Sequence, residues 1–322
     1  MALALRNSYS TPKHKPSPAQ QTGVSVVAGD LIIVAWRADK QNSVTCADNA
    51  VGGSNTYNEI GSGQYFSTAS CDMHVFYAIA KATETLTITI TTAAAAYSVI
   101  TVHVVSGALA DLDNVLDTYA FSTHTSNTQL STATINTTNA NDYIFIWWTE
   151  GAANNITVNE GNGLYTKRQE NTNYSVGGPS SSFDRIVSSR GAYSQNVNLT
   201  ATAPEVSIIA AFKSNLPDIT SFTSTPVKMQ NGESATLDWV IQRADSVSID
   251  QGIGTVTGSS RSVSPTASTT YTITATNTFG SVQADVTVGI IATMVQLNAF
   301  QNNAFQIISG VQYNATQMFM MF

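Results

Sequence analysis

Charged residues are scarce in this sequence. They make up 11% of its 322 residues, whereas roughly 25% is usual in globular proteins. Acidic residues outnumber basic ones, which gives a formal net charge of −7 and a pI near 4.9. Nucleic-acid binding generally needs a basic stripe on one face. The charge balance therefore argues against a nucleic-acid partner.

Long apolar runs and cysteines are also scarce. No stretch approaches the roughly 20 apolar residues of a membrane-spanning helix, so no membrane segment is expected. The first apolar run covers only Ala2 to Leu5 and its basic residues follow it, unlike a secretory signal. We therefore expect synthesis in the cytoplasm of the producing cell, without export by a signal peptide. Cys46 and Cys71 could pair, but two free thiols are favoured for such a protein.

Residues that carry catalysis or bind metals are few and scattered. No two histidines share a metal-type spacing, and neither cysteine belongs to a Cys-x-x-Cys pair. No Gly-x-Ser-x-Gly turn is present, and histidines within alternating strands are expected to be structural. We therefore predict no enzyme, no cofactor and no metal site. The histidines are His14, His74, His103 and His124.

The segment ADLDNVLD partly matches a calcium-binding loop. It carries Asp111, Asp113 and Asp117, and calcium loops place oxygen ligands at alternating positions. The glycine and the distal glutamate of such loops are missing. A polar loop between two strands is therefore the favoured interpretation.

Strand-forming sequence is abundant, and helix signals are nearly absent. Runs of Thr, Val, Ile and Tyr are separated by clusters of Gly, Asn, Asp and Ser, which predicts an all-β protein. We divide the chain into four parts. They are an extended arm (1–21), a jelly-roll-like β-sandwich (22–214), an Ig-like domain (217–289) and a C-terminal docking tail (290–322).

The arm, residues 1–21, contains three prolines and is locally basic. The prolines should keep it extended and out of a sheet. Two interpretations remain open. The arm is either a frayed terminus or a tether that holds an acidic neighbour through Lys13 and Lys15.

The region 22–214 contains an internal duplication. GDLIIVAWRADKQNSVTCADN resembles NDYIFIWWTEGAANNITVNEG, with matching residues 112 positions apart. Two four-stranded halves laid face to face would give an eight-stranded sandwich of jelly-roll type. The matched pairs are Asp30 with Asp142, Trp36 with Trp148, and Val44 with Ile156.

Two strands of this region, LIIVAW and YIFIWW, are apolar on both faces. A sandwich strand normally shows one polar face to water, so something must cover the outer faces. Adjacent Trp147 and Trp148 must point to opposite sides of their strand. We therefore predict a homo-oligomer, with a trimer favoured, whose interface with a neighbouring subunit or another protein includes Trp36, Trp147 and Trp148.

The stretch 217–289 reads as six or seven short strands. GESATLDWVIQ alternates cleanly, and TTYTITATNTFGSVQADVTV reads as a hairpin. Its size and pattern predict a small Ig-like sandwich. The expected core contains Leu237, Trp239, Tyr271 and Ile273.

A family resemblance supports this division. The segment from Pro217 to Ser281 resembles the Ig-like modules of bacterial surface proteins and tailed-phage virion proteins, through Phe222, Pro226, the Gly232–Trp239 strand, SVSID and TTYTITATN. The first domain more loosely resembles a sandwich of phage and bacterial structural proteins. Such modules serve mainly as spacers and docking surfaces.

The resemblance implies a structural protein on the surface of a tailed-phage virion. We expect a capsid decoration or cement protein that binds the major capsid protein and stabilises the shell. The alternative is a tail-fibre or tail-tip adhesin that binds host glycans through exposed aromatic side chains. Four tyrosines lie in loop-like stretches, but anchoring of their own loops is the favoured interpretation of these tyrosines. A secreted hydrolase is disfavoured because no paired-carboxylate motif is recognisable. The loop tyrosines are Tyr57, Tyr65, Tyr165 and Tyr174.

The tail contains NAFQNNAFQ and ends in MFMMF. An exposed apolar segment of this kind invites association. Phe300 and Phe305 would lie on opposite faces of a strand and about 140° apart on a helix, so a simple amphipathic helix is not expected. We predict an extended segment that docks onto a neighbouring subunit. Its anchors would be Phe300, Phe305, Phe319 and Phe322.

Overall fold

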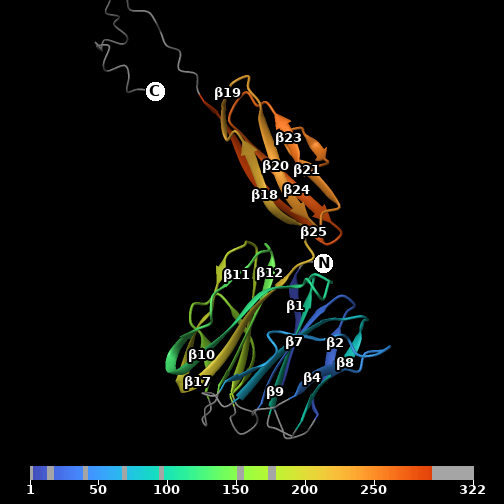
Figure 1. Ribbon diagram of the computed structural model, residues 1–322, viewed down its shortest axis with the longest axis vertical. Coiled ribbons are helices and arrows are strands. Elements are labelled where there is room, and N and C mark those ends of the chain that lie inside the picture. Colours follow the sequence, from blue (N-terminus) through green and yellow to red (C-terminus); the bar gives the residue numbers. More distant parts are fainter. Residues whose placement is uncertain are drawn as a thin grey trace, which may run out of the picture.

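The computed structural model describes residues 3–12, 18–38, 43–66, 71–93, 98–150, 156–172 and 179–291. Its regular structure is β-strand, in sheets that are almost wholly antiparallel, so the all-β prediction is confirmed. The described residues contain no helix able to cross a membrane. Two domains, residues 3–214 and 218–291, are stacked end to end (Figure 1).

The first domain consists of two halves that follow each other in the sequence. The first half contains β1 (Ala4–Pro12), β2 (Ala19–Val26), β3 (Leu31–Ala38), β4 (Val44–Asp48), β5 (Asn58–Glu59), β6 (Gln64–Phe66), β7 (Cys71–Ile79), β8 (Glu84–Thr92) and β9 (Ser98–Ser106). The second half contains β10 (Leu116–Ser131), β11 (Ile135–Asn136), β12 (Asp142–Glu150), β13 (Val158–Glu160), β14 (Thr166–Asn171), β15 (Ser180–Val187), β16 (Ala192–Tyr193) and β17 (Asn196–Lys213).

The two halves repeat one strand topology. A six-stranded sheet ordered β1-β9-β3-β7-β5, with β6 beside β7, matches one ordered β10-β17-β12-β15-β14, with β13 beside β17. The registers agree as well, because Leu31 and Tyr143, 112 positions apart, pair with residues that are themselves 107 positions apart. These partners are Ile79 and Val105 for Leu31, and Ile186 and Phe212 for Tyr143.

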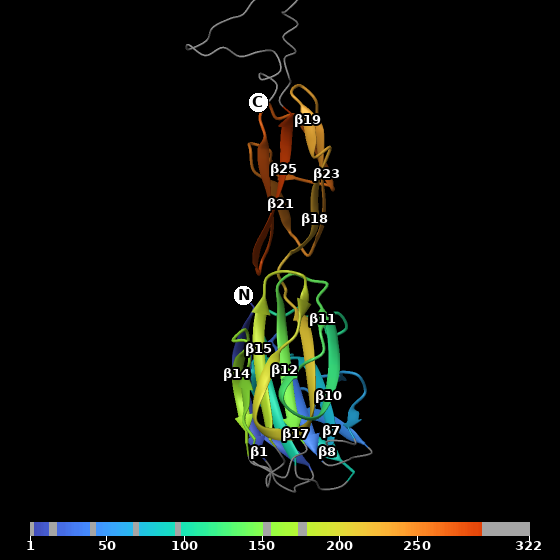
Figure 2. The ribbon, with the colours of Figure 1, turned by 90° about the vertical axis from the view of Figure 1, so that its left-hand side faces the viewer.

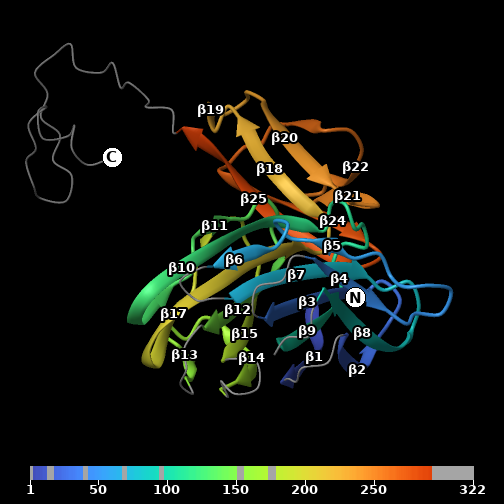
Figure 3. The same ribbon diagram turned by 60° about the horizontal axis from the view of Figure 1, so that its bottom comes forward.

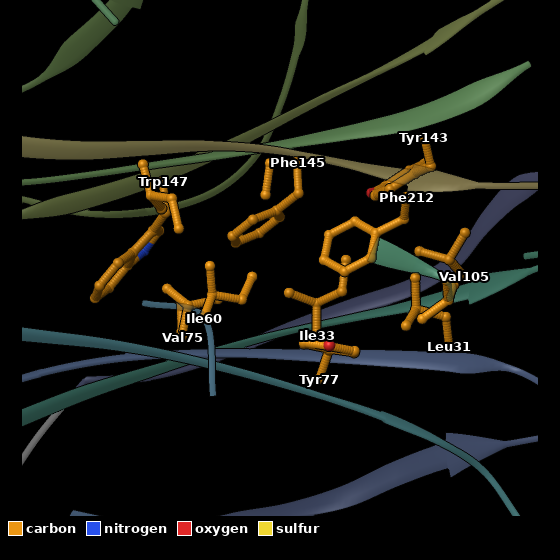
Figure 4. Close-up of a cluster of buried hydrophobic side chains, with 14 of the residues drawn as sticks. Leu31, Ile33, Ile60, Val75, Tyr77, Val105, Tyr143, Phe145, Trp147 and Phe212 are labelled. Atoms are coloured by element: carbon orange, nitrogen blue, oxygen red, sulfur yellow. The ribbon is translucent and has the colours of Figure 1, made fainter. Parts of the chain in front are cut away.

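The two six-stranded sheets pack face to face around a central core (Figure 4). Leu31 and Ile33 on β3 belong to the same cluster as Tyr143, Phe145 and Trp147 on β12. The structure thus has two six-stranded sheets where the sequence repeat predicted two four-stranded ones. Each half also builds its own outer layer.

The outer layers explain why the two apolar strands do not alternate. Ile32 and Val34 on β3 pack in a cluster with the β2-β8-β4 sheet, and Ile144 and Ile146 on β12 pack beneath β13 and the far ends of β10 and β17. These layers lie on opposite sides of the domain (Figure 3). Both faces of each strand are therefore covered within one chain.

This internal cover corrects the predicted aromatic interface. Trp36 is 1% exposed, and Trp147 and Trp148 are 0% exposed. None of the three can contact another subunit, because each is enclosed by its own chain. The trimer stays a prediction, but the double-faced strands no longer argue for it.

The N-terminal segment also differs from its prediction. β1 pairs with β9, and β2 pairs with β8, so much of residues 1–21 is sheet rather than a free arm. Pro12 ends β1, and Pro18 precedes β2. The prolines therefore bracket the strands without interrupting their hydrogen bonds.

The second domain packs a three-stranded sheet against a five-stranded one. Its strands are β18 (Asp218–Thr225), β19 (Lys228–Gln230), β20 (Ala235–Gln242), β21 (Ser246–Ile249), β22 (Gly254–Val256), β23 (Ser260–Val263), β24 (Thr269–Asn277) and β25 (Gly280–Ile291). The sheets are ordered β18-β20-β23 and β19-β25-β24-β21-β22, and β19 runs parallel to β25.

One buried cluster fills the space between these two sheets. It contains Leu237, Trp239, Tyr271 and Ile273. The indole nitrogen Nε1 of Trp239 donates to the carbonyl of Gly258 at 3.0 Å, so the polar atom of this buried ring is satisfied. The four residues that the sequence placed in this core therefore lie together.

Candidate functional site

The remaining predicted interface residues lie outside the described part of the chain. They are Lys13, Lys15, Phe300, Phe305, Phe319 and Phe322. The tail itself begins later than predicted, because β25 continues to Ile291.

A serine, a histidine and an aspartate meet between the two large sheets. Tyr143 donates its hydroxyl proton to Asp184 at 2.9 Å and lies 2.8 Å from Nδ1 of His103. Nε2 of His103 lies 2.9 Å from Oγ of Ser182. Because the tyrosine proton goes to Asp184, Nδ1 must carry the imidazole proton, and Nε2 accepts from Ser182.

This network is sealed, so it holds the sheets together and does not catalyse. His103 and Ser182 are both 0% exposed. Burial, aided by the charge of Arg168, lowers the pKa of His103 to about 3. The imidazole is therefore neutral at physiological pH and tied on both nitrogens. The sequence interpretation of His103 as a hydrogen-bonded structural residue agrees with this environment.

The acidic ADLDNVLD segment does not gather its carboxylates. Asp111 accepts a hydrogen bond from Nδ2 of Asn114 at 2.8 Å. Asp117 instead accepts one from the backbone of Thr138 at 2.6 Å. Within the described ranges, no group of three or more His, Cys, Asp or Glu side chains is placed to hold a metal ion.

The tyrosines divide into anchors and exposed rings, and the two exposed ones lie on strands β6 and β10. Tyr57 donates to Asp48 at 2.8 Å, and Tyr165 is 5% exposed, so both are held by their own surroundings. Tyr65 is 47% exposed, and Tyr119, which the sequence did not single out, is 41% exposed. Tyr174 lies outside the described residues.

The most elaborate polar site lies where the two domains meet. Arg190, in the turn between β15 and β16, directs one terminal nitrogen to both carboxylate oxygens of Asp218 at 2.6 Å. It also donates to the carbonyl of Ile219 at 3.2 Å and to that of Thr138 at 2.6 Å. A single guanidinium from the first domain thus holds the first strand of the second.

A second arginine reaches across the junction in the opposite direction. Arg243, from the second domain, donates to Oδ1 of Asn139 at 2.6 Å and to the carbonyl of Leu216 at 3.2 Å. Asn277 donates to the carbonyls of Asn215 and Arg243, both at 2.8 Å. We call Arg190, Asp218, Arg243, Asn139 and Asn277 the junction clamp.

The junction clamp fixes the short connection between the domains. Ser214 and Asn215 are also tied to the first domain, through a bridge to Ala108 and a hydrogen bond to Gly107 at 2.9 Å. Figure 2 shows the second domain continuing the long axis of the first. The site therefore sets an orientation between two domains rather than binding a small molecule.

Sequence reasoning missed the junction clamp because its residues form no motif. Arg190 and Arg243 stand in polar turns about fifty positions apart, with nothing local to distinguish them. The only signal in the sequence was the scarcity of basic residues. The chain has 14 Lys and Arg residues, so each arginine in a turn was a candidate for a specific contact.

Comparisons with known proteins identify no relative of this chain. No protein-family model matches it, and no curated protein matches it significantly.

Proposed function

We propose that the protein is a non-enzymatic structural component of a tailed-phage virion. Specifically, it is a capsid decoration protein whose first domain sits on the shell and whose second domain projects outward. The observation that carries this proposal is the strand order of the first domain. We assign the order of its duplicated halves to the jelly-roll type, an architecture found in viral capsid and lectin domains.

The jelly-roll assignment rests on which strands lie side by side. The neighbours β1-β9-β3-β7 on one sheet and β2-β8-β4 on the other suit the interleaved arrangement of a two-sheet jelly roll. The second half repeats it, with the far ends of β10 and β17 and strand β13 in place of β2, β8 and β4. Each half is thus assigned its own jelly roll, instead of contributing half of one.

The second domain is assigned to the Ig-like class. Its chain passes from the three-stranded sheet to the five-stranded sheet between β18 and β19, and its core is built around Trp239. Both features suit an Ig-like sandwich, which agrees with the resemblance of the sequence. Such modules act as spacers, and the junction clamp would hold this one at a fixed angle.

The polar, weakly charged surface supports a place in an assembly, where uncharged contacts are common. The exposed rings of Tyr65 and Tyr119 favour the alternative, an adhesin at the tail tip. Exposed aromatic rings combine apolar area with a polar hydroxyl, and jelly rolls also form lectin domains.

Immunogold electron microscopy of particles released from the host tests both functions. Antibodies raised against the full chain should label the shell if the protein is a decoration protein. Label confined to the tail would replace this proposal with the adhesin. Particles without label, from a lysate in which the protein is abundant, would overturn the virion assignment.

A further inference from the structure

Three ionisable side chains meet on adjacent strands near the junction. Lys213 ends the central strand β17, and its backbone pairs with Asp142 on β12. Asp117 lies on β10 at a register shift between Leu116 and Thr118. Nζ of Lys213 lies 3.6 Å from Oδ1 of Asp117. This separation is longer than a direct hydrogen bond, so the amine is close to the carboxylate without being tied to it.

The cluster holds one carboxyl group more than an ion pair needs. Asp142 is 0% exposed, and its Oδ1 accepts from Nδ2 of Asn139 at 2.9 Å. Burial and the neighbouring charge of Asp117 raise the pKa of Asp142 to about 8. Asp142 therefore carries a proton at neutral pH. Its other carboxyl oxygen, Oδ2, is buried without a hydrogen-bond partner among the described residues.

Asp117 itself is firmly positioned. Its side chain is 1% exposed, and it accepts hydrogen bonds from both the backbone nitrogen and the hydroxyl of Thr138. The backbone of Lys213 is fixed as well, since it donates to Val115 at 2.8 Å and accepts from Leu109 at 2.7 Å. The backbone that carries the amine and the carboxyl group of Asp117 are thus both fixed by the fold, which keeps the two groups near each other and favours reaction between them.

The first half of the domain supplies an internal comparison. At the corresponding register shift stands Arg6, and Asp30, directly before β3, is the counterpart of Asp142. Arg6 binds Asp30 through two hydrogen bonds of 2.7 and 3.0 Å, which closes an ordinary ion pair. Ser106 occupies the place of Lys213. The second half therefore has an amine beside Asp117 where the first half has a closed arginine–aspartate pair.

We propose that Lys213 and Asp117 form an intramolecular amide bond, with Asp142 as the group that moves the protons. The ammonium first gives a proton to the Asp117 carboxylate, which produces a neutral amine and a carboxylic acid. This transfer is the uphill step, because burial favours the acid but the hydrogen bonds from Thr138 outweigh it and hold the pKa of Asp117 below its usual range. Nζ then attacks Cγ of Asp117, and the N–H of Thr138 stabilises the oxygen on which charge develops.

The second part of the reaction expels water. Asp142 donates its proton to the departing hydroxyl and takes one from the nitrogen, so it ends unchanged. The C–O bond breaks as the C–N bond is completed. One ammonium and one carboxylate thus become one amide and one water molecule, without oxidant or cofactor.

The position of the bond suits a mechanical role. Lys213 is the last residue of β17 and directly precedes Ser214, where the chain leaves for the second domain. A pull on the second domain therefore enters the first through β17. An amide bond to β10 would prevent β17 from separating from the sheet. This role does not depend on the proposed function of the protein.

Mass spectrometry of the folded full chain tests the proposal. The N-terminal peptide is identified first, so that any removal of N-terminal residues is included in the calculated mass. The measured mass should then be lower than the calculated mass by one water molecule. Tryptic digestion should release a branched peptide that joins the segments containing Asp117 and Lys213, because trypsin does not cut after an acylated lysine.

Three variants complete the test. Lys213→Arg keeps the charge but removes the amine, and Asp142→Asn keeps the shape but removes the acid, so both should show their full sequence masses. Asp30→Asn, the matched control in the first half, should still lose water. A folded wild-type chain of full mass, or a lost water that maps to a linear peptide, would overturn the amide. Water loss in Asp142→Asn would overturn the role of Asp142.

Discussion

Glu150 on β12 and Glu205 on β17 lie directly opposite each other, and both are 0% exposed. All four of their carboxyl oxygens are buried without a hydrogen-bond partner among the described residues. Burial raises the pKa of Glu150 to about 8, although the charge of Arg37 opposes the shift. Burial and the charge of Glu150 raise the pKa of Glu205 to about 9.

This pair predicts that the first domain weakens as the pH rises. Unfolded glutamates lose their protons above a pKa of about 4.3, whereas the folded pair keeps its protons to higher pH. The free energy of unfolding is therefore highest at acidic pH and falls as the pH rises to about 9. Each carboxyl contributes a slope of up to about 1.4 kcal/mol per pH unit. Denaturant titrations at a series of pH values should show the free energy of unfolding decreasing from acidic to alkaline pH.

Glu205→Gln supplies the decisive variant for the pH slope. It keeps the shape of the protonated carboxyl but removes its titration, so the dependence of stability on pH should become shallower. Asp111→Asn, on an exposed loop, is the control and should leave the slope unchanged. An equally steep slope in Glu205→Gln would show that the buried pair does not titrate.

Trp239→Ala should unfold the second domain while the first domain keeps its own melting transition. Truncation of a buried tryptophan costs about 3–5 kcal/mol, comparable to the whole stability of a small domain. Differential scanning calorimetry should show the loss of one transition. Val240→Ala, at a neighbouring residue that is 52% exposed, is the control. A single merged transition in the wild type would mean that the domains do not unfold independently.

The sequence predicted strands and duplication well because both are written in local patterns. Alternation in GESATLDWVIQ identifies the buried face around Leu237 and Trp239, and the spacing of Asp30 and Asp142 identifies the repeat. An apolar run such as LIIVAW shows that both faces of its strand are covered, but it does not show by what. The cover came from strands of the same chain, whose pairing depends on contacts between distant segments.

Contacts across the junction could not be predicted from the sequence for the same reason: they join distant segments. The ion pair of Arg190 with Asp218 joins residues that belong to different domains, and no short-range pattern connects them. The amine and carboxyls near Asp117 are likewise assembled from three separate strands. Local patterns reveal periodicity, whereas side-chain clusters of this kind depend on the register of the complete sheet.

Removal of both clamp arginines should loosen the domain orientation without unfolding either domain. The double variant Arg190→Ala and Arg243→Ala loses the side-chain contacts to Asp218 and Asn139. Small-angle X-ray scattering should then report a broader distribution of long distances. Arg261→Ala, on an exposed strand of the second domain, is the control. An unchanged distribution in the double variant would show that the linker backbone alone sets the orientation.

Deletion of residues 292–322 should leave both domains folded but reduce incorporation into particles. The described structure ends at Ile291, which is 50% exposed, and nearby Val227 is 63% exposed. The docking tail therefore starts from a surface that is itself apolar, and such surfaces favour association. Quantitative comparison of truncated and complete chains in purified particles measures the effect, with calorimetry to verify that both domains melt as before. A truncated chain that enters particles at full occupancy would show that the tail does not dock the protein.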